Sequence, residues 1–346
     1  MRSEIEELFE GLHAHPEASG QERETEKILK DFIHTHTKMT LRDLPGGFSC
    51  LYHGYDPEKR IVIRADYDAV EVEEGVYRHL CGHDGHSSAL CLLGLLLEER
   101  GSKDDVVLLF QSSEENGEGA KKCLEVLEGT DEIYGAHNLP GFPLGEVYTK
   151  KGTFACASAG LLIRIKGRSA HAAYPESGLS PERLLRKILK VMEKYDSLPK
   201  MATLIEVKAG EEAYGVMAHD CDIAYTLRSE SEEGLEEMMK EVKDLIEREK
   251  GELTVSYEEK DRFPATVNHE ECVRKVLERT GGHILTEPRR WSEDFGHYLK
   301  RQKGAYLGIG AGVDTPDLHT ADYCYPKELI EKTAEVFYQI INEKNR

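Results

Sequence analysis

Residues 60–100 read RIVIRADYDAVEVEEGVYRHLCGHDGHSSALCLLGLLLEER, and this stretch decides the fold class. It begins with the apolar run RIVIRA at 60–65, typical of a buried strand, and ends with a Leu-rich buried helix over 88–100 that Gly101 terminates. The alternation continues with a strand at 106–111, a helix at 119–127 and a short strand at 133–136. This pattern predicts a parallel α/β sheet covered by helices over the first 150 residues.

The chain on either side of this stretch follows the same α/β pattern. Ser19 and Glu22 have the spacing of a capping box, and apolar residues then recur at helical intervals, so we expect a helix over 19–36. After Ala265 we expect helices at 268–279, 293–301 and 327–343 and a strand at 305–309. The α/β pattern therefore resumes toward the C-terminus.

The middle of the chain has a different order of elements. Strands are predicted at 160–166, 202–209, 222–228 and 253–258, and helices at 181–195 and 232–250. This βαββαβ order is that of the ferredoxin-like unit, which can fold alone. We therefore predict an α/β domain in two segments, 1–156 and 264–346, with a ferredoxin-like domain inserted at 157–263.

Length and composition bound the class of protein. The 346 residues exceed what one hydrophobic core usually organises, and 39% apolar with 32% charged residues is typical of globular chains. The net charge of −20 opposes binding to nucleic acid or anionic membranes, and no apolar run is long enough to span a bilayer. The acidic N-terminus lacks the features of a secretory signal, and the eight scattered cysteines include no CxxC pair. We therefore expect a cytoplasmic protein with reduced thiols.

Residues 79–86, HLCGHDGH, hold the densest group of potential metal ligands. They place a thiol, three imidazoles and a carboxylate just before a buried helix. Gly82 allows a turn tight enough for Cys81 and His83 to bind the same ion. The alternative for this segment alone is a polar loop with helix-capping residues.

Four predicted strands each lead into side chains that bind metals or transfer protons. Strand 60–65 leads to Asp66 and Asp68, strand 106–111 to Glu114 and Glu115, strand 133–136 to His137, and strand 305–309, after a loop, to His319. Active sites of open α/β sheets lie outside the carboxyl ends of their strands. We therefore expect these side chains to meet at one rim of the sheet.

The candidate ligands are more numerous than one tetrahedral structural site requires. They are Cys81, His83, Glu115, His137 and His319. Five ligands suit two divalent ions about 3.5–4 Å apart, an arrangement that activates water for hydrolysis. A carboxylate must still transfer the proton, and we assign this role to Glu114, which adjoins Glu115 without needing to be a ligand. Thiolate and imidazole ligands favour zinc, nickel, cobalt or manganese over magnesium or calcium.

Eight motifs follow one another along the chain: HAHPEASGQERETEKI (13–28), RADYDAVEVEE (64–74), HLCGHDGH (79–86), LLFQSSEENGEGAKK (108–122), YGAHNLPGFPLGEV (134–147), IKGRSAHAAYP (165–175), WSEDFGHYL (291–299) and LHTADY (318–323). In this order they resemble the motifs of the aminoacylase-like dinuclear metallopeptidases, most closely the hippurate hydrolase and auxin-conjugate amidohydrolase branch. The resemblance implies hydrolysis of N-acyl, especially N-acetyl, amino acids. It also implies a catalytic α/β domain of the zinc-peptidase kind, interrupted by a ferredoxin-like lid or dimerisation domain.

The resemblance also implies roles for individual residues. The five candidate ligands match the family's metal ligands, and Glu114 matches its catalytic base. His171 matches a histidine that contacts the substrate carbonyl oxygen, often across a dimer, where it would donate a hydrogen bond to the oxyanion. Asp68 resembles a carboxylate that orients a ligand histidine.

Three further positions bear on the substrate and on the dimer. Gly215 stands where relatives carry an Asn that holds the substrate or shapes the dimer. Trp291 stands where smaller residues are usual and is expected to narrow the pocket. Arg228 matches a strand position at which it could bind a substrate carboxylate or form a structural ion pair.

Alternatives to N-acyl amino acid hydrolysis remain. They are a dipeptidase, an N-acetyl-diaminopimelate-type deacetylase, and a catalytically silent metal-binding protein. Glu114 argues against the last, because a binding module needs the ligands but not an extra base. The expected partners are a small N-acyl amino acid and a second copy of the chain bound through the inserted domain.

Overall fold

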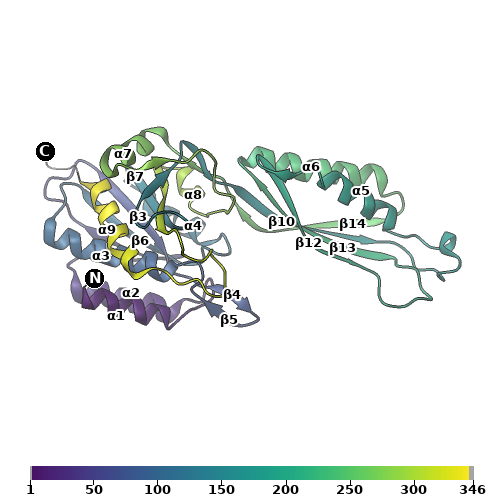
Figure 1. Cartoon of the computed structure of the whole chain (residues 1–346), viewed down its shortest axis with the longest axis horizontal. Helices are drawn as coiled ribbons and strands as arrows, with labels where there is room; N and C mark the ends of the chain where they lie inside the picture. The colour runs from purple at the N-terminus through teal and green to yellow at the C-terminus, as the bar shows by residue number, and fades with distance from the viewer. Residues whose placement is uncertain (1, 343–346) are drawn as a thin grey trace. The chain divides into compact units, whose positions relative to one another are not determined.

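The computed structural model describes residues 2–342, which form two compact units (Figure 1). Unit 1 contains the described residues up to Phe154, then Thr266–Pro288 and those from Asp294 onward, and unit 2 contains Ala155–Ala265 and Arg289–Glu293. The domain predicted at 157–263 lies within unit 2. Residues 155–156, 264–265 and 289–293, predicted in the α/β domain, belong to unit 2 instead. The Cys156 amide ties 289–293 to this unit by donating to the carbonyl oxygens of Arg289 and Trp291, both at 3.1 Å.

Unit 1 is built on an eight-stranded sheet with the order β1-β2-β6-β3-β7-β17-β8-β16. The strands are β1 (Thr40–Leu44), β2 (Gly47–Tyr52), β3 (Arg60–Asp66), β6 (Asp105–Gln111), β7 (Glu132–Pro140), β8 (Val147–Thr149), β16 (His283–Ile284) and β17 (Gly304–Gly312). The central strands β6, β3, β7 and β17 pair in parallel, as the alternation of strands and helices predicts. The sheet is mixed rather than parallel throughout, because β2 is antiparallel to both β1 and β6, and β8 is antiparallel to β17. Only two residues join β1 to β2, and a link that short permits only antiparallel pairing.

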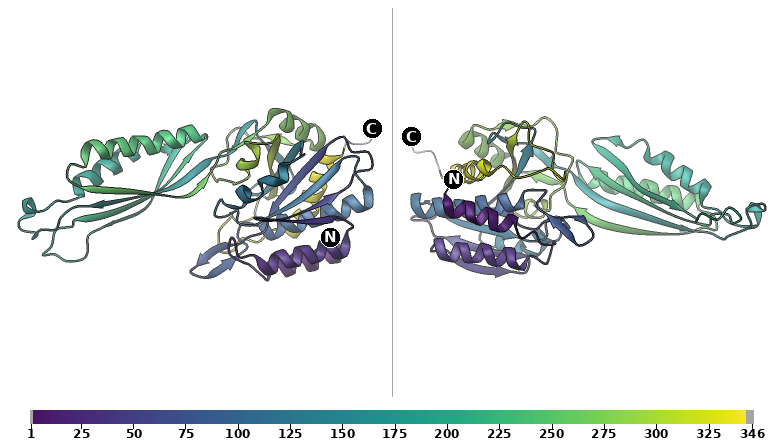
Figure 2. Two further views of the ribbon diagram at one scale, coloured as in Figure 1. Left: turned by 180° about the vertical axis from the view of Figure 1, so that it is seen from behind. Right: turned by 60° about the horizontal axis from the view of Figure 1, so that its bottom comes forward.

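Helix α3 (His83–Arg100) is the central helix of unit 1. It is buried from His83 to Leu97; the stretch 89–97 is apolar on all sides, as expected of a buried helix, and the polar residues of 83–88 are buried as well. It packs against α1 (Ser3–His13), α2 (Arg23–His36) and α9 (Lys327–Ile341), and α9 packs against α7 (Glu270–Thr280) (Figures 1 and 2). None of the helices within residues 2–342 is both long enough and apolar enough to cross a membrane. The burial of α3 fixes its N-terminus, where the predicted ligands begin.

Three predicted helices differ from the structure. The helix expected at 119–127 is a short α4 (Gly119–Lys122) followed by a 3₁₀ turn at Leu124–Leu127, and the one expected at 293–301 is only α8 (Gly296–Leu299). The residue before Phe295, Asp294, lies outside α8, and its side chain accepts a hydrogen bond from the Ala120 amide at the start of α4 at 2.8 Å. The capping box is also wrong: the Ser19 hydroxyl donates to Asp68, and α2 begins at Arg23. The last residue of the helix expected at 327–343 lies outside the described residues.

Unit 1 also contains two small strand pairs, which the sequence patterns did not predict. The hairpin of β4 (Val70–Glu73) and β5 (Val76–Arg78) precedes the ligand-rich loop, and β9 (Gly152–Ala155) pairs with β15 (Thr266–Asn268). All four strands are too short to carry a clear alternation of apolar and polar residues.

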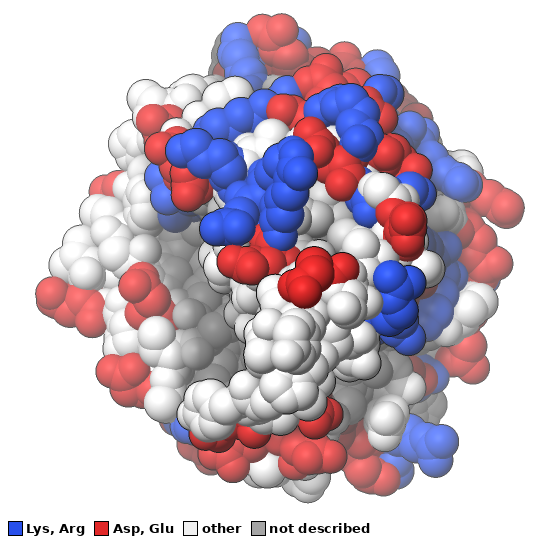
Figure 3. All heavy atoms as spheres, turned by 90° about the vertical axis from the view of Figure 1, so that its right-hand side faces the viewer, with Lys and Arg blue, Asp and Glu red and all other residues white. Residues whose placement is uncertain are grey.

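Unit 2 is an antiparallel sheet with the order β11-β12-β13-β10-β14, covered by helices α5 (Glu182–Met192) and α6 (Glu232–Glu249). Its strands are β10 (Ala157–Lys166), β11 (Asp196–Ser197), β12 (Lys200–Ala209), β13 (Asp220–Ser229) and β14 (Thr254–Phe263). Apart from the two-residue β11, this is the predicted βαββαβ order. Buried residues alternate along β10 and β13 and meet the apolar faces of both helices in a separate core. Figure 3 looks onto unit 2 and shows Lys and Arg side chains interspersed with Asp and Glu around an uncharged projection.

A buried ion network lies at the carboxyl end of the central strands. Arg64 of β3 is 2% exposed, and its guanidinium donates to Asp66 at 2.5 Å and to Asp294 at 2.8 Å. The Arg64 Nε atom donates to Gln111 of β6 at 2.9 Å, and Gln111 in turn donates to Asp294 at 2.8 Å. The network joins β3, β6 and the segment before α8 directly below the rim.

We predict that Arg64→Met lowers the free energy of unfolding by about 3–5 kcal/mol, because it leaves the Asp66 and Asp294 carboxylates buried without their cation. Urea unfolding followed by circular dichroism measures this loss. The matched control is Arg60→Met on the same strand. The Arg60 side chain is 37% exposed and lies 3.5 Å from Asp105, so its loss should cost less than about 1 kcal/mol. Equal losses in the two variants would contradict a special role for the buried pair.

Candidate metal centre

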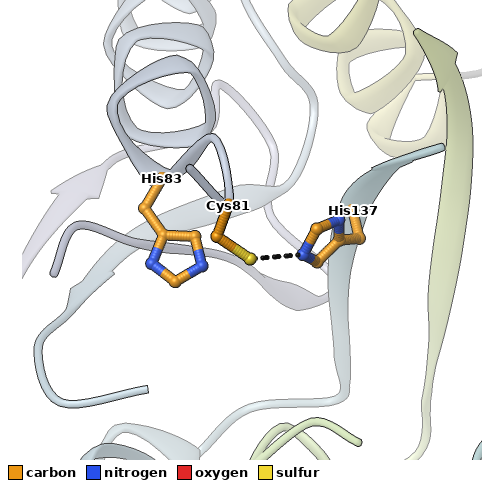
Figure 4. Close-up of side chains that lie close together, drawn as sticks. All are labelled: Cys81, His83 and His137. Atoms are coloured by element: carbon orange, nitrogen blue, oxygen red, sulfur yellow. Dashed lines mark hydrogen bonds between the residues drawn. The ribbon is translucent and has the colours of Figure 1, made fainter. Parts of the chain in front are cut away.

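The rim of the central strands brings the predicted ligands together. The Sγ atom of Cys81 lies 3.3 Å from Nε2 of His137, and Figure 4 shows Cys81, His83 and His137 pointing toward one another. The Glu115 Oε1 atom lies 3.7 Å from Nε2 of His83 and 3.7 Å from Nε2 of His319. Residues 81, 115, 137 and 319 therefore converge although they come from four separate parts of the chain.

The ligand atoms form two overlapping groups that share Cys81. Cys81, His83 and His137 make one group, and Cys81, Glu115 and His319 make the other, with the ligand atoms of each group within 4.8 Å of one another. His83 Nε2 and Glu115 Oε1 are buried and have no hydrogen-bond partner among residues 2–342. Buried nitrogen and oxygen atoms without a hydrogen-bond partner are suited to binding a cation. The mixed set of sulfur, nitrogen and oxygen ligands is the kind that zinc and similar metals prefer.

Backbone groups and one carboxylate orient the ligand histidines. His83 Nδ1 lies 3.0 Å from the Asp68 carbonyl oxygen and 3.2 Å from its carboxylate, and His137 Nδ1 lies 2.9 Å from the Asn138 carbonyl oxygen. A ring that donates from Nδ1 presents the lone pair of Nε2 to a metal. Both rings are therefore held with Nε2 directed into the cluster.

The charges of the cluster also suit a cation. Burial raises the pKa of the Glu115 carboxyl to about 7. Burial disfavours protonated His83, but the carboxylates of Asp66 and Asp68 outweigh it and raise the pKa of His83 to about 10. Without a metal, a proton on His83 thus offsets the surrounding carboxylates. A divalent ion would supply this positive charge instead and displace the proton.

Two glycines allow the ligand loop to lie close to the loop that carries His319. Gly82 has a left-handed φ of +97°, and a Cβ atom there would lie 2.7 Å from the Tyr325 ring. At Gly85 a Cβ atom would lie 2.3 Å from the same ring. The His319 amide donates to the Leu80 carbonyl oxygen at 2.8 Å. The two loops thus fit together only with glycine at both positions.

The remaining predicted residues occupy two places. Glu114 lies in the cluster, 4% exposed, with Oε2 4.0 Å from His83 Nε2. His171 lies in unit 2, where its Nδ1 accepts a hydrogen bond from the Ala173 amide at 3.0 Å. Arg228 and Trp291 also belong to unit 2, and Gly215 lies in an exposed loop of that unit. The structure therefore brings the ligands, Glu114 and Asp68 together in unit 1. The residues expected to contact the substrate, His171, Arg228 and Trp291, belong to unit 2.

Sequence reasoning missed the polar residues behind the ligands. His86 Nδ1 lies 2.6 Å from Asp66, and its Nε2 lies 2.6 Å from the Asn138 side-chain oxygen. Asn138 in turn donates to the Tyr323 hydroxyl at 2.5 Å. The spacing of His83 and His86, three residues apart on one helix, was the available signal that His86 shares the rim.

Fold and site together define a metal-dependent hydrolase that acts on amide bonds. The chain belongs to peptidase family M20/M25/M40, whose sequence pattern matches residues 62–343. It is 28% identical to an N-acetyldiaminopimelate deacetylase of Leuconostoc mesenteroides, over 90% of this chain and 89% of that protein. It is 27% identical to the IAA-amino acid hydrolase ILR1-like 4 of Arabidopsis thaliana, over 86% of this chain and 75% of that protein.

The fold is also that of a solved structure. The Bacillus subtilis YXEP protein, described as a dinuclear metal binding peptidase of the M20 family, superposes with a TM-score of 0.83 at 23% identity. The match covers 97% of this chain and 96% of that one. These comparisons confirm the predicted family, fold class and hydrolase activity.

We predict that Cys81→Ala lowers the amount of metal bound per chain, because its Sγ atom is shared by both ligand groups. Elemental analysis after loading with zinc and desalting measures the stoichiometry. Cys91→Ala is the matched control, since Cys91 is a buried core thiol of α3 outside both groups. Unchanged stoichiometry in Cys81→Ala would remove Cys81 from the ligand set.

Proposed function

We propose that this protein hydrolyses the amide bond of N-acyl amino acids, with N-acetyl compounds as the main class. The observation that carries the proposal is the pair of ligand groups sharing Cys81, one fully buried and one ending on the exposed His319, with the buried Glu114 carboxylate beside them. The proposed cofactor is two divalent ions, drawn from zinc, manganese, cobalt and nickel. The similarity to deacetylases of N-acetyldiaminopimelate favours a small acyl group, and a substrate of that type is the second candidate.

The residues of this chain would divide the reaction between them. Bound metal would supply a Lewis acid that polarises the substrate carbonyl and acidifies water. Glu114 would accept the proton of the attacking water and return it to the amine as the C–N bond breaks. The acyl group would leave as a carboxylate and the amino acid as a free amine. Asp68 would hold His83 in the orientation that keeps Nε2 in the ligand set.

His171 is our candidate for stabilising the oxyanion. The ring nitrogen Nδ1 already accepts a hydrogen bond from the Ala173 amide, which leaves Nε2 to carry the proton. A donor of this kind strengthens as negative charge develops on the carbonyl oxygen. We propose that His171 reaches the substrate within one chain or from a second copy.

Arg228 is our candidate for binding the substrate carboxylate. Its guanidinium donates to the Arg290 carbonyl oxygen at 3.0 Å and to the Ser292 hydroxyl at 3.2 Å, both neutral acceptors. A fixed guanidinium with neutral neighbours suits an incoming carboxylate. Trp291 lies between these two contacts in sequence, and we propose that it bounds the same part of the pocket.

We predict that protein loaded with manganese, cobalt or zinc releases amino groups from N-acyl amino acids, whereas chelator-treated protein does not. The substrate panel contains N-acetyl amino acids, N-benzoyl amino acids, N-acetyl-diaminopimelate and dipeptides. Each substrate is compared with an analogue in which its carboxylate is blocked as an amide. Glu114→Gln should keep its metal but lose about 10²–10⁴-fold in turnover, because it lacks the base. Equal loss of metal and activity would show that Glu114 is a ligand instead. No turnover across the panel, with metal bound, would refute the proposed substrate class.

We also propose a homodimer formed through β12, the edge strand of unit 2. Beyond its short pairing with β11, the outer edge of β12 has no strand partner among the described residues. Leu204, Ile205 and Val207 are 47%, 62% and 40% exposed there, and Leu204 lies beside Tyr225 and Leu189 of unit 2 in an apolar hollow. Open edges of this kind invite another strand, and a second copy can add the same strand antiparallel about a two-fold axis.

The expected mass in solution is therefore about twice the 39.1 kDa of the chain. We predict that Ile205→Lys shifts the protein toward the monomer in sedimentation experiments, because a charge would be buried at the paired edge. Val267→Lys is the control, a substitution at a residue of unit 1 that is 45% exposed. A monomeric wild type, or the same dimer in Ile205→Lys, would contradict this interface.

A further inference from the structure

The segment of residues 13–22, from the last residue of α1 to the residue before α2, lies directly behind the metal centre. We call it the N-terminal strap. His13 Nδ1 lies 2.6 Å from Asp84, the Ser19 hydroxyl donates to Asp68 at 2.7 Å, and the Glu22 carboxylate accepts from the Ser113 amide at 2.8 Å. Each of these bonds ends on a residue next to, or in contact with, a candidate ligand or Glu114. The strap itself contains none of the proposed ligands.

One of these bonds ends on the turn Ser113–Glu115, which carries the proposed base and one proposed ligand, and a second reaches the turn through Asp68. The Ser113 amide donates to Glu22, and the Glu115 amide donates to the Asp68 carboxylate at 3.0 Å, where Ser19 also donates. The amides on both sides of Glu114 are therefore held by carboxylates. The direction of the Glu114 and Glu115 side chains depends on the conformation of this turn.

The conformation of the turn is unfavourable at its first residue, Ser113. Ser113 is fully buried and has a φ of +57°, the left-handed region that a residue with a Cβ atom rarely adopts. Such strain persists only where surrounding contacts impose it. The bond from the Ser113 amide to Glu22 is a contact of that kind at the strained residue itself.

Burial of the Glu22 carboxyl costs free energy. Its side chain is 5% exposed, and no Lys or Arg forms an ion pair with it in the described part of the chain. Burial and the neighbouring Asp68 raise the pKa of Glu22 to about 7. Burying a carboxyl without a cation costs free energy, so stability of the fold does not explain why Glu22 lies here. We therefore look for its role in the hydrogen bond that it accepts from the Ser113 amide.

We propose that Glu22 is a positioning residue that holds the strained Ser113–Glu115 turn, and with it Glu114 and Glu115, in working geometry. This inference rests on the proposed function for the roles of Glu114 and Glu115. Its hydrogen bond is to the Ser113 amide, so we propose that it acts through the backbone of Ser113.

The test compares Glu22→Leu, Glu22→Gln and a control, Glu17→Leu. Glu17 is a second carboxylate of the strap, but it accepts hydrogen bonds from the amide and hydroxyl of Thr25, both at 2.8 Å, at the start of α2. Its loss should lower the unfolding midpoint without touching the turn. Glu22→Gln keeps an oxygen that can accept from Ser113, and should therefore retain most of the metal affinity and turnover.

Two readouts separate positioning from general stability. Titration of metal-free protein with Zn²⁺ should show about tenfold weaker binding at one of two sites in Glu22→Leu, but not in Glu17→Leu. Under saturating metal, kcat of Glu22→Leu should fall about 100-fold with little change in KM, because the base and ligand are displaced. Wild-type affinity and kcat in Glu22→Leu, or parallel losses in Glu17→Leu, would overturn the inference.

The double variant Glu22→Leu with Ser113→Gly tests the route of the effect. Glycine adopts a positive φ without support, so the second substitution should restore part of the lost Zn²⁺ affinity. No recovery would show that Glu22 does not act through Ser113. If wild-type protein turns over no substrate of the panel, the proposed function fails, while the Zn²⁺ titrations still decide for or against the role of Glu22.

Discussion

The buried contact of Arg64 with Asp66 and Asp294 is the interaction on which the rest of the structure depends. It connects a central strand to a segment 230 residues later in the chain, with Gln111 completing the link to the next strand. Taking these charges out of water is expensive, and the arrangement is tolerable only because the guanidinium meets both carboxylates and an amide oxygen at once. Asp66 also contacts His86, so the network continues into the polar layer below the ligands.

The metal centre illustrates how a site can be assembled largely from backbone geometry. The ligand histidines take their orientation from carbonyl oxygens of Asp68 and Asn138, and the Glu114 turn is held through two of its own amides, which donate to carboxylates. Glycines at 82 and 85 let the Tyr325 ring pack directly against the backbone of the ligand-bearing segment. Groups of this kind reorganise little when charge changes nearby, which is what a preorganised hydrolytic site requires.

Much of this arrangement could be predicted from the sequence. The run RIVIRA and the Leu-rich helix carry strong periodic signals, and the carboxyl-end rule then placed Glu115, His137 and His319 at one rim, where the structure has them. The roles of these residues stay predictions. The pairing of Arg64 with Asp294 could not be predicted, because a contact between distant single residues leaves no local pattern. The prediction for Ser19 and Glu22 was wrong for a related reason. Their spacing suits a capping box, but their side chains form hydrogen bonds with Asp68 and the Ser113 amide, which lie far away in the sequence.

The position of β17 sets the order in which the molecule can be completed. It is the last strand to be synthesised, yet it lies inside the sheet between β7 and β8, and the loop after it carries His319. Unit 2 is nearly continuous in sequence and has its own core, so its contacts are available while unit 1 still lacks an inner strand. The larger sheet must therefore remain open along β7 until the C-terminal part of the chain arrives. During that interval β7, which is buried from Ile133 to Leu139 in the finished sheet, is the part of the nascent protein most in need of protection from pairing with other chains.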